Sequence, residues 1–162
     1  IGVAEEHFFA MYLRNKLGAL FHHRTRLERG RKLLVACLPG ELHEVGMLLF
    51  ALAAHDFGYK PIMLGANMPL SGLSLAAHRA SCCAIVLSAR CDPAPGLVEK
   101  ELADLVNTAA VPVFVGGNAT VSLNDTVIRA GAISLGKDID AGLRRLADRI
   151  GPPAAVADPK SS

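Results

Sequence analysis

The sequence predicts an α/β domain in which five parallel strands form one sheet with helices on both faces. Two observations lead to this prediction. Short apolar runs recur from residue 32 onward, and a segment with helical spacing of its apolar residues follows each run. Because a strand followed by a helix returns to the sheet in the same direction, this alternation favours a parallel sheet covered on both sides.

The elements can be assigned in order. The strands are KLLVACL, KPIMLG, CAIVLS, VPVFVGG and AISLG, which begin at residues 32, 60, 83, 111 and 132. The helices are HEVGMLLFALAAHDFG, ending at Gly58, LSGLSLAAHRA, opened by Ser71, then PGLVEKELADLVNTA, TVSLNDTVIRAG and KDIDAGLRRLADRI. At this length a flavodoxin-like sheet with strand order 2-1-3-4-5 is the leading prediction.

The two ends of the chain differ from this α/β part. Residues 3–22 carry apolar side chains at helical spacing and predict one or two helices, whose apolar stripe must pack on the domain or in a helical bundle. The basic stretch RTRLERGRK at 24–32 is either an anion contact or, by our preference, a solvated linker. We therefore expect a helical segment and linker over 1–30, the α/β domain over 31–150 and a disordered tail over 151–162.

Composition excludes several classes of function. The chain has 162 residues, 51% of them hydrophobic and 20% charged, which suits one globular domain. A net charge of +2 and the lack of tryptophan disfavour a nucleic-acid interface. The four cysteines form no C-x-x-C pair and are expected to be reduced, buried thiols. No signal peptide or membrane-spanning run is evident, so a cytoplasmic protein without membrane contact is expected.

Three loops that follow strands must meet at one rim of the sheet, where ligands of such sheets bind. They are LPGELHEVG at 38–46, SAR at 88–90 and GGNAT at 116–120. In the first loop the imidazole of His43 can coordinate a metal, and Glu41 is placed to accept the other ring N–H. Gly46 lets the backbone approach something bulky. An isolated histidine near a helix start is more often structural, so His43 alone decides nothing.

The three loops together resemble a known signature. E-L-H-E-V-G at 41–46, Ser88 and the Gly116-Gly117 pair are similar to the D-x-H-x-x-G, S-x-L and G-G pattern of cobalamin-binding domains. The resemblance implies base-off, His-on binding, in which His43 is the lower ligand of cobalt, the serine contacts the displaced nucleotide tail and the glycines line its channel. The cofactor-binding residues that we expect on the α/β domain are Glu41, Leu42, His43, Glu44, Gly46, Asn67, Ser88, Arg90, Gly116, Gly117 and Asn118.

The sequence departs from this pattern at two positions. Glu41 replaces the usual Asp, and Arg90 stands where the pattern has Leu. A glutamate at this position resembles the light-sensing MerR-family regulators of the CarH and LitR type, which also carry a Glu-His pair on a helical bundle over the upper face of the corrin. Glu6-His7 matches that pair in place and spacing. The DNA-binding domain of those regulators is absent from this chain, so contact with DNA is expected only through another domain.

The resemblance implies a non-enzymatic photoreceptor domain that uses adenosylcobalamin, with methylcobalamin possible, and that controls a homo-oligomer or a transcriptional output. Light would remove the bulky upper ligand of cobalt, and a helix packed against it would respond. The alternative is a corrinoid methyl carrier of a methyltransferase system, which also combines a helical bundle with a flavodoxin-like domain. A flavodoxin-like interaction module without a ligand is the weakest interpretation. Arg90 could pair with the nucleotide phosphate or form a surface ion pair, and Asn67 could reach the corrin or only shape a turn.

Overall fold

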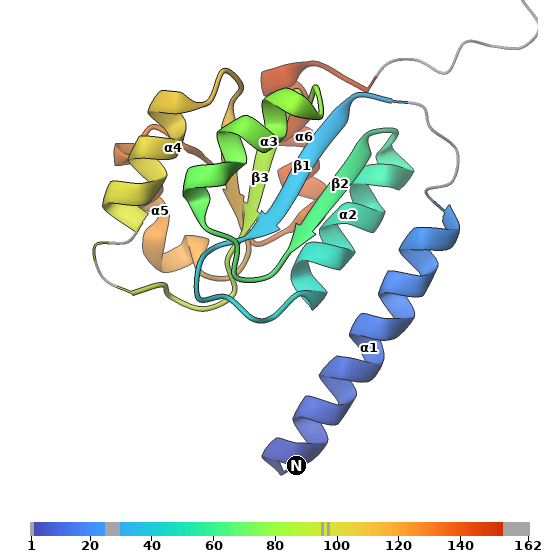
Figure 1. Ribbon diagram of the computed structural model, residues 1–162. Coiled ribbons are helices and arrows are strands. Elements are labelled where there is room, and N and C mark those ends of the chain that lie inside the picture. Colours follow the sequence, from blue (N-terminus) through green and yellow to red (C-terminus); the bar gives the residue numbers. More distant parts are fainter. Residues whose placement is uncertain (1, 25–29, 95, 97, 154–162) are drawn as a thin grey trace, which may run out of the picture.

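A computed structural model of the chain describes residues 2–24, 30–94, 96 and 98–153. Five parallel strands form one sheet in the order β2-β1-β3-β4-β5, which confirms the predicted fold class and strand order (Figure 1). The strands are β1 (Lys32–Cys37), β2 (Lys60–Gly65), β3 (Ala84–Ser88), β4 (Val113–Gly116) and β5 (Ile133–Gly136). The helices are α1 (Val3–Arg24), α2 (Val45–Phe57), α3 (Leu73–Arg79), α4 (Ala103–Thr108), α5 (Thr120–Arg129) and α6 (Ile139–Ile150).

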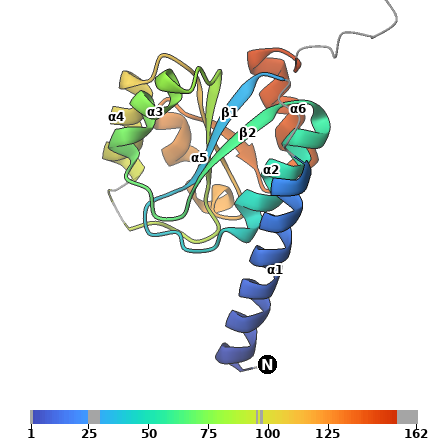
Figure 2. The same ribbon diagram turned by 45° about the vertical axis from the view of Figure 1, so that its right-hand side comes forward.

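The sheet has an apolar core on each face, because successive strand residues point to opposite sides. In β1, Leu34 and Ala36 join the core under α3, α4 and α5, whereas Leu33 and Val35 join the core under α2 and α6. Figure 2 shows these two helical layers on either side of the sheet. The buried, nearly continuous apolar strands of the sequence are thus explained by a sheet that is covered twice.

The boundaries of three predicted helices need correction. Ser71 does not open the second one, because the chain enters it from Pro69 through a 3-10 turn over Leu70–Gly72, and no side chain caps it. The third helix begins with a π-helical turn, Val98–Leu102, before α4. The first predicted helix, α2, starts only at Val45. The Glu41 carboxylate holds His43 in the loop, and the Glu44 carboxylate is held by the N–H of Ala66. Gly58 ends α2 in the left-handed conformation, as predicted.

The N-terminal segment forms a single long helix. α1 packs its C-terminal half on α2, where Phe21 lies against Ala51 and Leu52. Its N-terminal half projects past the carboxyl ends of the strands (Figure 1). Phe8 and Phe9 on this half are 74% and 62% exposed. The predicted apolar stripe is therefore only partly covered within the described residues. The predicted tail from residue 154 onward and residues 25–29 of the basic stretch lie outside the described residues.

The prediction that the cysteines are buried thiols is only partly correct. All four thiols are free; Cys37 and Cys82 are buried, and burial raises the pKa of Cys37 to about 12. Cys91, by contrast, is exposed on the loop after β3, where it adjoins the predicted site. Among the described residues, no helix combines the length and the apolarity that crossing a membrane requires.

Candidate cofactor site

Glu41 organises the rim of the sheet. Its side chain is buried, with the residue only 4% exposed, and its carboxylate accepts four hydrogen bonds. Oε1 receives the backbone N–H of His43 at 2.8 Å and the ring Nδ1–H of His43 at 2.7 Å. Oε2 receives the backbone N–H groups of Arg90 and Cys91, each at 2.9 Å. One carboxylate thus joins the loop after β1 to the loop after β3.

The ionisation of Glu41 decides that Nδ1 of His43 is protonated. Burial alone raises the pKa of Glu41, but the hydrogen bonds from Cys91, His43 and Arg90 together outweigh it and hold the pKa below its ordinary value. An ionised carboxylate can only accept, so Nδ1 of His43 must carry the proton. In the neutral imidazole the Nε2 lone pair is then free, and the side chain is 46% exposed at the rim. This is the arrangement in which a carboxylate orients a histidine for metal coordination.

Glu41→Gln should therefore destabilise the domain. A carboxamide has one oxygen where the carboxylate has two, so two of the four N–H groups would face an NH₂ group. We expect the free energy of unfolding to fall by about 3 kcal/mol. Urea unfolding checks this, with the exposed Glu101→Gln as the control that should change it by less than about 0.5 kcal/mol. Equal stability of the two variants would show that the Glu41 contacts do not hold the rim together.

A second side chain of the same loop ties the site to α1. Glu44 is paired with Arg14 of α1, and its Oε1 accepts the backbone N–H of Ala66 at 3.0 Å. A cleft of about 550 Å³ between α1 and the edge of the domain is lined by both side chains and by Met63. The sequence did not predict the role of Arg14, because it depends on how α1 docks on the domain.

The loop around His43 has further supports. Asn67 has a left-handed backbone (φ 52°), and its Oδ1 accepts the N–H of Gly40 at 3.1 Å, so it holds the His43 loop from the loop after β2. A turn role for Asn67 is thus present in the structure. Leu42 is 72% exposed beside His43. Gly46 faces Ser88, and a Cβ at Gly46 would lie 3.7 Å from the Ser88 hydroxyl.

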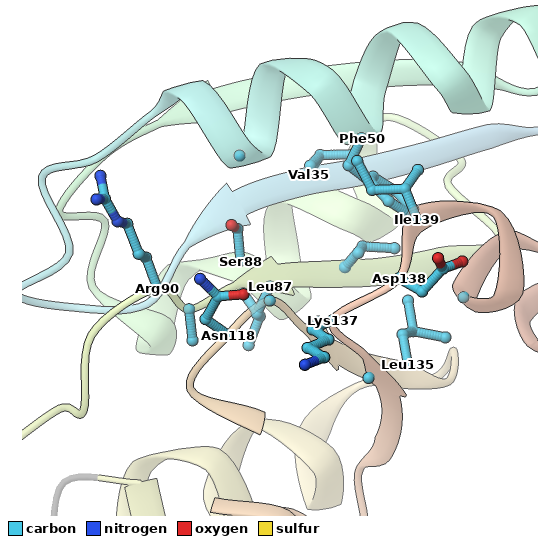
Figure 3. A pocket seen from close by; sticks show the side chains of 17 residues that line it. Val35, Phe50, Leu87, Ser88, Arg90, Asn118, Leu135, Lys137, Asp138 and Ile139 are labelled. Atoms are coloured by element: carbon cyan, nitrogen blue, oxygen red, sulfur yellow. The ribbon is translucent and has the colours of Figure 1, made fainter. Parts of the chain in front are cut away.

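A cavity of about 170 Å³ opens beside these residues (Figure 3). Ser88, Arg90, Gly116, Gly117 and Asn118, all predicted site residues, line it, and apolar side chains such as Val35, Phe50 and Leu135 form its walls. Gly117 is necessary here because its φ is 114° and a Cβ would lie 2.3 Å from the carbonyl oxygen of Ala89. The cavity runs down between β3, β4 and the start of α6.

Two further residues at the rim were missed. Lys137 lines the cavity, and its position directly after β5 could have revealed it, since the ends of all parallel strands meet at this rim. Cys91 places its sulfur with the ligand atoms of Glu41 and His43, all within 4.8 Å of one another.

Glu6 and His7 are exposed on the projecting half of α1, and no hydrogen bond or ion pair within the described residues joins them to the rim.

Comparison with known sequences shows which proteins this chain is similar to. No protein-family model matches the chain. The HTH-type transcriptional repressor CarA of Myxococcus xanthus is 30% identical over 118 residues, which are 72% of this chain and 41% of CarA. The repressor CarH of the same organism is 36% identical over 74 residues, 46% of this chain and 24% of CarH.

This chain is a relative of the CarA and CarH repressors. The relationship confirms the CarH-type resemblance that the E-x-H loop predicts. The chain spans less than half the length of either repressor.

Structural comparison supports the fold. A cobalamin-binding protein from Desulfitobacterium hafniense superposes with a TM-score of 0.58 at 19% identity, over 74% of this chain and 58% of that protein. The monomethylamine corrinoid protein of Methanosarcina barkeri superposes with a TM-score of 0.65 at 16% identity, over 85% and 66% of the two chains. At these identities the likeness establishes that this CarH relative shares their fold.

Proposed function

We propose that this chain binds cobalamin at the carboxyl edge of its sheet, with Nε2 of His43 as the lower ligand of cobalt. The observation that carries the proposal is the buried Glu41 carboxylate, which fixes the proton on Nδ1 and leaves Nε2 free at the rim. The adjoining apolar cavity suits the displaced nucleotide tail, with Ser88 and the Gly116-Gly117 pair along it. The residues present therefore fit the cofactor on chemical and steric grounds.

The same proposal includes a regulatory role. CarA and CarH are transcriptional repressors, which favours a sensory domain without turnover over an enzyme. Adenosylcobalamin supplies a cobalt–carbon bond that light breaks. The N-terminal half of α1 carries Glu6 and His7. It extends beyond the carboxyl ends of the strands (Figure 1), the side to which a corrin held by His43 would turn its upper face. The Arg14–Glu44 pair ties α1 to the His43 loop, so loss of an upper ligand can shift how α1 packs.

The projecting half of α1 carries exposed apolar side chains that a second copy of this chain could cover. We therefore expect light to change the assembly of identical chains. Reconstitution with adenosylcobalamin in the dark, followed by green light, should change the absorption spectrum irreversibly and alter the sedimentation coefficient in analytical ultracentrifugation. The matched control is the same protein loaded with cyanocobalamin, which lacks the adenosyl group and should sediment identically before and after illumination. Identical sedimentation of the adenosylcobalamin sample in dark and light would refute light-controlled assembly.

A corrinoid methyl carrier is the second candidate, favoured by the likeness to the monomethylamine corrinoid protein over most of the chain. The two functions differ in which cofactor form is used. A carrier would be isolated with methylcobalamin and would pass the methyl group to a partner enzyme in the dark. A photoreceptor would respond to illumination alone.

A further inference from the structure

Two cationic side chains that have no partner among the described residues line the cavity near its mouth. Arg90 follows β3 and Lys137 follows β5, and both residues are exposed. Within the part of the chain that the structure describes, neither guanidinium nor amine takes part in a hydrogen bond or ion pair; only the backbone N–H of Arg90 is used, by Glu41. In Figure 3 Asn118 lies between the two residues, and the exposed Arg90 side chain extends away from Asn118.

The charged side chains that line the cavity are two cations and one carboxylate, so their sum is positive. Asp138 is the one acidic residue in the lining, and its Oδ1 is already engaged, since it accepts the N–H of Ala141 at 2.7 Å as the cap of α6. The start of α6, a helix of 12 residues, adds the positive end of its dipole. Deeper in, the walls are apolar. The cavity thus suits a ligand that has an apolar ring at one end and a phosphate next to it.

We infer that Arg90 and Lys137 hold the phosphodiester of the nucleotide tail and thereby select complete cobalamin over corrinoids that lack the tail. The inference rests on the proposed function and adds the groups that discriminate between corrinoids. Arg90 stands where the S-x-L pattern has leucine, so this cation is not part of that pattern. A guanidinium suits the task because it can donate two parallel hydrogen bonds to a phosphate.

The test is a titration of the whole chain with adenosylcobalamin and, separately, with adenosylcobinamide, which lacks the nucleotide tail. The variants are Arg90→Leu, Lys137→Met and the double variant. The controls are Arg79→Leu and Lys100→Met, which remove the same charges from the exposed surfaces of other segments. We expect the wild type to prefer adenosylcobalamin and the double variant to bind it about tenfold to thirtyfold more weakly, as loss of two charge-assisted contacts predicts. Its affinity for adenosylcobinamide should not fall, and added salt should weaken adenosylcobalamin binding less than in the wild type.

Other outcomes separate this inference from the proposed function. If the double variant binds adenosylcobalamin like the wild type, or loses affinity for both corrinoids equally, the cations do not hold the phosphodiester, and the proposed function still stands. If the wild type binds neither corrinoid, the proposed function fails, and this inference fails with it.

Discussion

Replacing His43 with alanine is expected to leave the fold intact and to weaken cobalamin binding on the order of 100-fold. The side chain is 46% exposed and its one polar contact goes to Glu41, so its loss creates no cavity. In the proposed site, however, Nε2 is the only imidazole atom available to cobalt from the rim. Binding is measured by titration with absorption spectroscopy, in which any cofactor still bound should lack the spectrum of an imidazole-ligated corrinoid.

The matched control for His43→Ala is His78→Ala, which removes an exposed histidine from α3. That variant should bind cobalamin like the wild type and keep its free energy of unfolding to within about 0.5 kcal/mol. His43→Ala should stay folded but lose about 1 kcal/mol, because the buried Glu41 carboxylate loses one of its four donors. Wild-type affinity and an unchanged spectrum in His43→Ala would assign the lower ligand to another nitrogen donor and would contradict the proposal.

Gly117→Ala should have the largest effect on stability. The backbone of Gly117 has φ 114°, and an added Cβ would lie 2.3 Å from the carbonyl oxygen of Ala89, a backbone atom that cannot turn aside. Ala89 also binds Gly116 and Ala119 through its own backbone groups, so the clash would spread along the rim. We expect the free energy of unfolding to fall by about 3 kcal/mol or more.

Gly116→Ala provides the comparison within the same pair. Its added Cβ would meet the Leu135 side chain at 3.4 Å, which is ordinary contact, and its backbone is that of strand β4. It should therefore cost less than about 1 kcal/mol in urea unfolding. If Gly117→Ala were as stable as Gly116→Ala, the left-handed turn that closes the cavity would not be required.

Much of the fold could be predicted because its determinants are local in the sequence. Each buried strand is a short apolar run, and Gly58 ends α2 as its position indicates. The helix starts were less predictable, since they depend on contacts between loops. The start of α2 is delayed because the carboxylates of Glu41 and Glu44 bind backbone N–H groups around the loop, and Ser71 was misassigned because Pro69 already turns the chain.

In the site, too, contacts between residues close in the sequence could be predicted and contacts between distant residues could not. The sequence predicted His43 and its orientation by Glu41, because the two are separated by one residue. It could not show that the second oxygen of Glu41 holds the loop after β3, which lies about fifty residues further along the chain. Nor could it show that Arg14 pairs with Glu44, since this depends on how α1 docks. Lys137 could have been predicted, because it directly follows a predicted strand.

The most direct test of the central claim is an electron paramagnetic resonance spectrum of the cobalt(II) form bound to protein labelled with nitrogen-15 histidine. The unpaired electron lies along the axis that the lower ligand occupies, so the nuclear spin of that ligand atom splits the cobalt lines. Coordination by His43 predicts doublets in the labelled protein and triplets in the unlabelled one, with neither pattern in His43→Ala. Triplets in the labelled protein would mean that the cofactor keeps its own base, and this would contradict the account.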